Sequence, residues 1–232
     1  MNWLHFTARL AARIIQIFLK PLTSENLKAC FVIDDSLYER AEYKRTELAA
    51  RVFDHVSMRY KKGFRLLILG WTDGGTSLPI NSVLLSSTKD KNILGKKPSF
   101  DHRTLSHKRQ EMAKEKGTTV MVRLLKKALG EGISAKYALF GSWFPNPKQL
   151  LDILGLKLHA IAMIKRSAKR YYGFEGKCMT VKQIFAASKK RRGHPQYLLS
   201  VPVKIHVKQE DVREETAETQ IVCVRNRHNR KD

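Results

Sequence analysis

Hydrophobic and polar positions alternate along the first two thirds of the chain in patterns that predict regular elements. Apolar residues recur at helical spacing from Leu4 to Phe18, and Pro21 closes this segment, so we expect an amphipathic helix there. Short apolar runs bounded by turn residues predict strands. These runs lie at 29–33, 64–71, 78–85 and 137–140, with a further buried strand expected at 158–164.

Helices are expected between these strands. Helical spacing returns over 118–129 and, after Pro147, through Leu154. The segment 39–60 is polar and helix-permissive, and the polar, basic segment 88–117 is typical of a long solvated connection or an exposed helix. Three strands, a helix, a strand, a helix and a strand in this order predict an α/β fold, a mixed sheet flanked by helices.

The pattern changes after Ile164. In residues 201–208, Val201, Val203, Ile205 and Val207 alternate with Pro202, Lys204, His206 and Lys208, which predicts a half-buried strand with a basic outer face. An acidic turn is expected at 209–218, and a last strand at 220–224. We therefore expect three parts, which are a helical lead-in at 1–28, an α/β core at 29–164 and a β-rich basic region at 165–232.

Composition adds a polyanionic partner to this picture. The 232 residues include 44 lysines and arginines against 21 aspartates and glutamates, a formal net charge of +23. Such an excess predicts binding to DNA or RNA, because each cation placed on a phosphate releases a condensed counterion. Net charge alone does not exclude a ribosomal or other RNA-associated protein. Three dispersed cysteines and eight histidines without ligand spacing argue against a zinc site. No apolar run is long enough to cross a bilayer, so a cytoplasmic location without a membrane partner is expected.

Two basic runs follow the α/β core, and contact with DNA phosphates is the role that the net charge favours for them. Their members are Lys165, Arg166, Lys169, Arg170, Lys189, Lys190, Arg191 and Arg192. The alternative is that these runs are only solvated charge. Tyr171 and Tyr172 adjoin the first run and are equally compatible with stacking on unpaired bases and with a structural role.

Two carboxylates, Asp34 and Asp35, come directly after the apolar run 29–33. Phosphoryl transfer on DNA commonly uses two divalent metals about 4 Å apart, and Mg²⁺ prefers carboxylate oxygens as ligands. A carboxylate at the end of a buried strand offers such a ligand on a rigid base. Asp34 fits this arrangement, whereas Asp35 alternates to the opposite side. An aspartate that ends a strand is also an ordinary turn residue, so both interpretations of Asp34 are open at this point.

Six blocks of the sequence, in order, resemble the DDE transposases of the insertion-sequence-four kind. They are 31–36 (FVIDDS), 50–55 (ARVFDH), 63–74 (GFRLLILGWTDG), 137–144 (YALFGSWF), 160–165 (AIAMIK) and 222–227 (VCVRNR). The resemblance covers nearly the whole chain. It implies a ribonuclease-H-like fold in which a β-rich insertion subdomain precedes the last catalytic helix.

The resemblance also assigns roles to particular positions. It makes Asp34 the first catalytic acid and a metal ligand. The second acid belongs in a block of the form LFDSWF, and here that block has Gly141 in the place of the carboxylate. The third acid, a glutamate on a later helix, is expected beyond residue 232, so the C-terminal catalytic helix is expected to be missing. Most of an N-terminal region that binds DNA ends is expected to be missing as well.

The resemblance therefore implies a transposase fragment that binds DNA, in particular transposon ends. The intact family would use Mg²⁺ or Mn²⁺ for strand cleavage and transfer, and we expect this chain to be catalytically inactive without its second and third acids. Association with itself or with an intact transposase, and a place on a bacterial nucleoid, are expected too. The alternative is a basic DNA- or RNA-binding protein without an enzymatic role, such as a regulator of an intact transposase.

Overall fold

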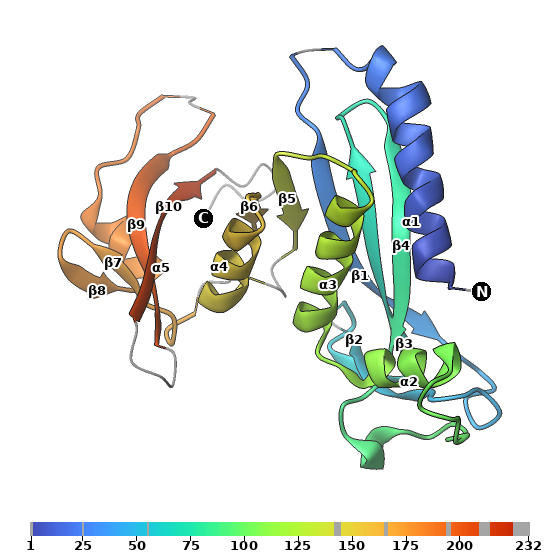
Figure 1. The fold of residues 1–232 in the computed structure, drawn as a ribbon. Helices are drawn as coiled ribbons and strands as arrows, with labels where there is room; N and C mark the ends of the chain where they lie inside the picture. The colour runs from blue at the N-terminus through green and yellow to red at the C-terminus, as the bar shows by residue number, and fades with distance from the viewer. Residues whose placement is uncertain are drawn as a thin grey trace. The chain divides into compact units, whose positions relative to one another are not determined.

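The computed structural model describes residues 2–24, 26–54, 56–141, 145–164, 167–193, 196–208 and 214–224 (Figure 1). The chain divides into two compact units. The first contains Met1–Pro145 and Asp152–Met163, and the second contains Asn146–Leu151 and Ile164–Asp232. None of the described helices is long and apolar enough to cross a membrane.

A mixed six-stranded sheet organises the first unit. Its strands are β1 (Cys30–Glu39), β2 (Ala50–Asp54), β3 (Arg59–Thr72), β4 (Ser77–Leu85), β5 (Tyr137–Phe140) and β6 (His159–Ala162). The order is β2-β3-β1-β5-β6, and β4 also pairs with β3. The first four strands pair antiparallel, whereas β5 runs parallel to β1 and β6 runs parallel to β5. The predicted mixed sheet flanked by helices is confirmed.

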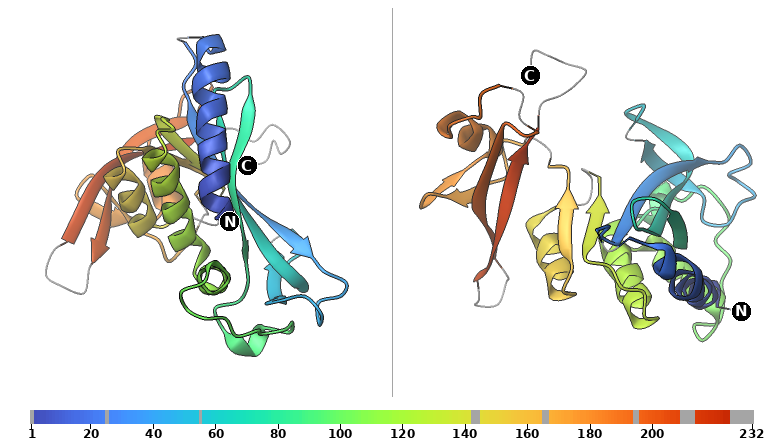
Figure 2. Two further views of the ribbon diagram at one scale, coloured as in Figure 1. Left: turned by 45° about the vertical axis from the view of Figure 1, so that its right-hand side comes forward. Right: turned by 90° about the horizontal axis from the view of Figure 1, so that it is seen from above.

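Two helices pack on the same face of this sheet, α1 (Trp3–Ile14) and α3 (Gly117–Gly130) (Figure 2). Three alanines and an isoleucine form the buried side of α1 and of the π-helical turn that continues it, and these small side chains let the helix lie close to β4. Below them the sheet contributes large buried residues, which are Phe31, Ile33, Leu67, Leu69, Trp71 and Ile80. The helix predicted up to Pro21 is confirmed, since the chain leaves it through a 3₁₀ turn at Lys20–Leu22.

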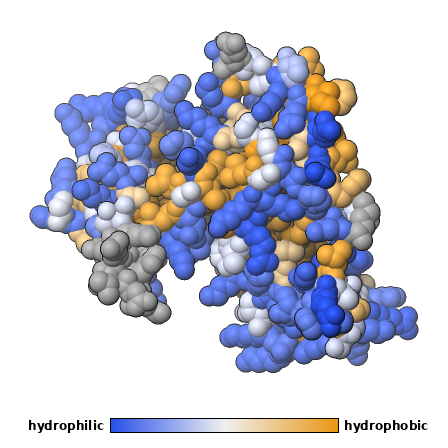
Figure 3. Space-filling view, in the orientation of Figure 1, coloured by the Kyte–Doolittle hydropathy of each residue, from blue (hydrophilic) through white to orange (hydrophobic). Residues whose placement is uncertain are grey.

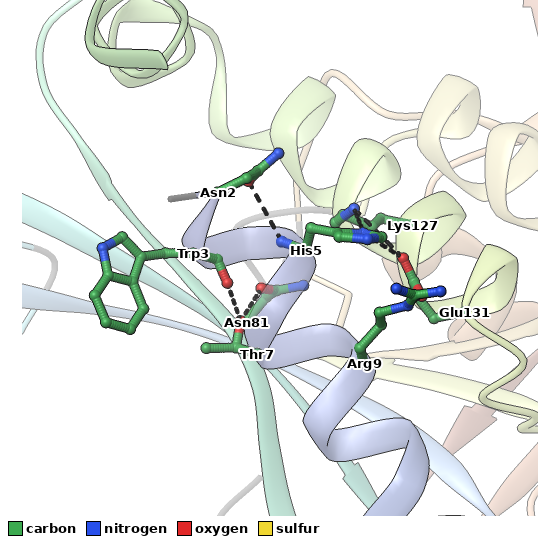
Figure 4. Close-up of polar contacts among 8 residues, drawn as sticks. All are labelled: Asn2, Trp3, His5, Thr7, Arg9, Asn81, Lys127 and Glu131. Atoms are coloured by element: carbon green, nitrogen blue, oxygen red, sulfur yellow. Dashed lines mark hydrogen bonds and ion pairs between the residues drawn. The ribbon is translucent and has the colours of Figure 1, made fainter.

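Polar contacts hold α1 in place on this face (Figure 4). The Thr7 hydroxyl donates a hydrogen bond to Oδ1 of Asn81 on β4 at 2.7 Å. The Glu131 carboxylate, just after α3, lies 2.8 Å from Nδ1 of His5 and 3.4 Å from Nε of Arg9. These contacts join α1 to both the sheet and α3. The outer side of α1, in contrast, leaves hydrophobic side chains at the surface (Figure 3).

Four predicted features of the first unit are wrong or incomplete. Strand β1 does not end at residue 33 but continues to Glu39. The segment 39–60 forms no helix within its described residues. It contains β2, whose Ala50 and Val52 are buried in a cluster with Phe64. The polar segment 88–117 contains α2 (Leu105–Lys114), which buries Met112 and Ala113. Strand β6 was expected to be buried, but it lies at the edge of the sheet.

The described part of the second unit contains a smaller four-stranded sheet, one complete helix and the start of another at Asn146–Leu151. Its strands are β7 (Tyr172–Phe174), β8 (Lys177–Met179), β9 (Leu199–Lys208) and β10 (Glu214–Cys223), in the order β10-β9-β7-β8, and its complete helix is α5 (Val181–Ala187). Helix α4 (Pro147–Gly155), as predicted from Pro147, connects β5 to β6. The alternation predicted for β9 is confirmed, because Val203 and Ile205 are buried whereas Lys204 and His206 are exposed.

The acidic turn expected at 209–218 is wrong in its second half. Strand β10 begins at Glu214 and pairs with β9 along its whole length. Glu218 stands opposite Lys204 in this register, and their charged groups are 4.0 Å apart. Opposite charges on facing strands stabilise a sheet, so acidic residues are accommodated in β10. Residues 209–213 lie outside the described part of the chain.

Candidate functional site

Asp34 lies in the middle of β1, where it pairs with Ile68 of β3 and comes directly after Ile33, the last residue of β1 that pairs with β5. Side chains alternate between the two faces of a strand, and Asp34 shares its face with Val32 and Ser36. All three are exposed, whereas Phe31 and Ile33 point into the core. Asp34 is therefore held on a rigid central strand with its carboxylate open to solvent. The expectation that it ends a strand is wrong, because β1 continues for five residues beyond it.

Asp35 points to the opposite face and is a structural residue. Its side chain is 4% exposed and forms an ion pair with Arg65 of β3, whose side chain is 29% exposed. The Arg65 Nε donates a hydrogen bond to Oδ1 of Asp35 at 3.1 Å, and an Nη of the same guanidinium contacts Oδ2. Burial lowers the pKa of Arg65 from its ordinary value. Asp35 is thus paired within the sheet and does not share a site with Asp34.

Gly141 comes directly after β5, one residue beyond the pairing of β5 with β1. The last pair in the parallel register of β1 and β5 is Ile33 with Phe140, and the residues that follow are Asp34 within β1 and Gly141 just after β5. Ile33 and Phe140 are both buried and the next two residues are both exposed, which places a side chain at position 141 on the face that carries Asp34. A β-carbon on Gly141 would meet no described atom within 4 Å apart from the adjoining residues.

The described residues do not fit a divalent metal site. They contain no group of three or more histidine, cysteine, aspartate or glutamate side chains that could hold a metal ion. On the exposed face of β1, Asp34 offers its carboxylate, but the neighbouring Gly141 has no side chain and Asp35 is committed to Arg65 on the other face. We therefore derive no catalytic step through a metal in this chain.

The predicted DNA-binding residues belong to the second unit, and six of the eight are described. Lys165 and Arg166 lie outside the described residues. Lys169, Lys189, Arg191 and Arg192 are exposed, whereas Arg170 and Lys190 are half-buried.

Aromatic rings accompany the second basic run. The Lys190 ammonium lies 4.8 Å from the centre of the Phe185 ring, and the Arg191 guanidinium lies 4.2 Å from that of Tyr197. Phe185 also lines a cavity of about 840 Å³ together with Tyr171, which adjoins the first run. The two basic runs, separated by about twenty residues in sequence, thus approach the same cavity. Tyr172 is buried and belongs to the core of the unit, so of the two tyrosines Tyr171 is the one available for stacking.

Arg65 is a residue of this region that the sequence patterns did not single out. It interrupts the apolar run 64–71 of β3, and a charged residue inside an apolar run is a signal that an opposite charge lies on a neighbouring strand. Because Asp35 was expected on the side of its strand opposite Asp34, the pair could have been anticipated from these two facts together.

The fold and this site define a class of protein. A mixed sheet flanked by helices, with an aspartate presented from its central strand, is the arrangement of a ribonuclease-H-like nuclease domain. A family model described as a DDE superfamily endonuclease matches residues 2–231, so the chain belongs to that family. Members of this superfamily act on DNA and generally use divalent metal ions. No curated protein matches the chain.

Proposed function

We propose that this chain is a transposase-type nuclease domain of the insertion-sequence-four kind that binds DNA but does not cleave it. The observation that carries this proposal is the position of Gly141, which directly follows Phe140, the residue of β5 that pairs with Ile33 just before Asp34. Asp34 and Gly141 each come one residue after the last paired residues of β1 and β5, and both are exposed. The sequence block around Gly141 resembles one that has an aspartate there, so the missing group is a carboxylate beside Asp34.

The spacing of the two positions explains why one missing carboxylate matters. Neighbouring strands lie about 4.8 Å apart, and side chains on one face of such a pair can converge on a single cation. Mg²⁺ is held by oxygens at about 2.0–2.1 Å, and usually by one or two carboxylates together with substrate phosphates. With Asp34 alone, the place has one protein carboxylate to share between the two metal ions that phosphoryl transfer on DNA commonly uses, so one of the ions has no carboxylate of its own.

The experiment restores the second carboxylate. Gly141→Asp adds it where the backbone has room and φ is not left-handed, and Gly141→Asn adds a side chain of the same size without the charge. We expect Mn²⁺ to raise the melting temperature of Gly141→Asp and to leave those of Gly141→Asn and the wild type unchanged. We also expect the wild type to produce no nicks in supercoiled DNA with Mg²⁺ or Mn²⁺.

Two results would contradict the proposal. Metal-dependent nicking by the purified wild-type chain, which is abolished by Asp34→Ala, would show that the site works without a carboxylate at position 141. Equal Mn²⁺ effects on the Asp and Asn variants would show that positions 34 and 141 do not share a cation.

DNA binding is the part of the function that the net charge of +23 supports. Lys189 and Arg192 are exposed, and with Lys169, Arg170, Lys190 and Arg191 they are proposed to contact phosphates. A second candidate function is that of a regulator that occupies transposon ends without cutting them. It is favoured by the same Gly141, because a chain of this family that binds without cleaving would compete with an active enzyme. Salt titrations of binding to a terminal repeat and to an unrelated duplex distinguish the two candidate functions. Preference for the terminal repeat supports the regulator, and equal binding to both DNAs contradicts it.

A further inference from the structure

A second place in the first unit carries uncompensated positive charge. A cavity of about 400 Å³ lies where β2, β3 and the end of β4 meet the start of α3. Its charged and hydroxyl-bearing lining includes Arg51, Arg65, Ser87, Thr88, Glu115 and Lys116. This cavity lies outside the Asp34 site, and none of the basic residues expected from the sequence to bind DNA lines it.

The acidic group of this cavity is already neutralised. The Glu115 carboxylate is held by the Arg123 guanidinium through two contacts, at 2.8 and 2.9 Å. The Arg65 charge is balanced in the same way by Asp35. Arg51 and Lys116 are both exposed, and within the described part of the chain neither has an ion pair or a side-chain hydrogen bond. The cavity therefore has a net charge of about two positive units from these groups.

Several hydrogen-bond donors line the cavity. The Ser87 oxygen accepts hydrogen bonds from the backbone N–H of Lys89 at 3.1 Å and from Nδ2 of Asn92 at 3.2 Å. Because both lone pairs are used, its own O–H is left to donate. The backbone N–H groups of Gly117 and Thr118 open α3 and have no acceptor among the described residues.

The start of α3 adds to the positive potential. A helix carries a partial positive charge at its first turn, which acidic residues commonly offset. The first turn of α3 contains no acidic residue, and a lysine, Lys116, stands at the N-cap. An anion bound in the cavity would relieve the repulsion between this helix end and the two unpaired cations.

We infer that this cavity binds a phosphate group. A phosphate offers several acceptor oxygens and a negative charge, which match the donors and the two cations. The favoured source is the DNA backbone, because the two cations are exposed at the cavity and can reach a polymer. This source rests on the proposed function, whereas binding of a free phosphate does not.

The experiment compares two double variants of the full chain that remove equal charge. Arg51→Gln with Lys116→Gln removes the two unpaired cations of the cavity. Arg59→Gln with Lys126→Gln is the control. These two exposed cations lie on β3 and α3, which border the cavity, but neither side chain lines it. Each lost phosphate contact lowers the slope of log K against log salt by about 0.9. For the cavity variant, we expect the slope of log K against log salt for duplex DNA to fall in magnitude by about 2, and the affinity near 0.1 M salt to fall about 60-fold. The control pair should lose less than half as much of each.

A second measurement separates the two sources of phosphate. Inorganic phosphate is added in place of chloride at constant ionic strength, and the melting temperatures of the wild type and of both double variants are recorded. Phosphate should raise the melting temperatures of the wild type and the control pair, but not that of the cavity variant.

Each outcome decides the inference. A lowered slope specific to the cavity variant supports DNA phosphate, and phosphate-dependent stabilisation without a slope change supports a free phosphate instead. Equal slopes for the two double variants together with no phosphate-dependent stabilisation overturn the inference. Failure of the wild type to bind DNA at all contradicts the proposed function, and the melting measurement then decides the cavity by itself.

Discussion

Asp35→Ala removes one partner of the ion pair that β1 and β3 hold inside the sheet of the first unit. The Asp35 side chain is 4% exposed and Arg65 is bound to it through two nitrogens. After the substitution, the Arg65 guanidinium keeps its charge and loses its only described carboxylate partner. A buried charge without a partner has lost hydration that nothing replaces, so the folded state is destabilised.

The size of the effect follows from the exposure of the arginine. Breaking a buried pair by removing one partner costs about 3–5 kcal/mol. Arg65 is 29% exposed and lines a cavity, so water can reach part of it and the lower end applies, about 3 kcal/mol. Replacement of both partners, as in Asp35→Leu with Arg65→Met, leaves no unpaired charge. We expect that double variant to lie within about 1 kcal/mol of the wild type.

Urea unfolding followed by tryptophan fluorescence measures these differences. Trp71 is buried in the same unit and donates to the backbone oxygen of Ser134 at 3.2 Å, so its emission reports unfolding of this sheet. With a slope of about 3 kcal/mol per M, Asp35→Ala should lower the urea midpoint by about 1 M. Asp34→Ala is the matched control, since the neighbouring carboxylate is exposed, and should cost less than about 0.5 kcal/mol. Equal losses for Asp34→Ala and Asp35→Ala, or a double variant less stable than the single one, would refute the reasoning.

Two further predictions concern the β2–β3 hairpin and its contact with β1. Hydrogen bonds from the Ser57 hydroxyl and the Val56 backbone N–H lower the pKa of Asp54 to about 2. The ionised carboxylate therefore stabilises the folded state fully at pH values above its ordinary pKa of 3.8, and this stability is lost as the pH falls through about 2. The urea midpoint of Asp54→Asn should therefore lie furthest below that of the wild type near neutral pH and approach it near pH 2, whereas a constant difference would contradict this. Gly63 has a φ of +151°, and a β-carbon there would lie 2.1 Å from a backbone oxygen of β1. Gly63→Ala should destabilise the first unit by at least about 2 kcal/mol. Gly130→Ala is the control, because a β-carbon at this position of α3 meets open space, and it should be neutral or slightly stabilising. Similar urea midpoints for the two variants would count against this reasoning.

Much of the fold could be predicted from local patterns, and the errors occur where distant residues decide. The strand containing Phe64 to Trp71 and the helix starting near Thr118 have strong periodicity, and both are found. Two adjacent carboxylates suggested that β1 ends at Asp34, but Arg65 of the neighbouring strand accommodates Asp35 and lets the strand continue. Such a partner is thirty residues away in sequence, so no local rule can include it.

In the candidate site, the faces of the side chains could be predicted from the sequence, but the residues that neighbour Asp34 on other strands could not. That Asp34 and Asp35 face opposite sides follows from strand alternation, and the structure agrees. The adjacency of Asp34 and Gly141 depends on the parallel register of β1 and β5, which no hydrophobic pattern specifies and which the family resemblance only implied. The cavity beside Arg51 was not predictable, because its lining comes from four separate segments of the chain.

The parallel pairing of β1 with β5 has a consequence for the chain during its synthesis. About 100 residues separate the end of β1 from the start of β5. At roughly 5–20 residues per second, β1 is translated about 5–20 s before β5 follows it. Until then the backbone N–H and C=O groups along that side of β1 have no strand to pair with, and an open edge is a template for association with other nascent chains. The strand that presents Asp34 is therefore also a place where this protein is exposed to co-translational aggregation, and slow translation between the two strands would lengthen that exposure.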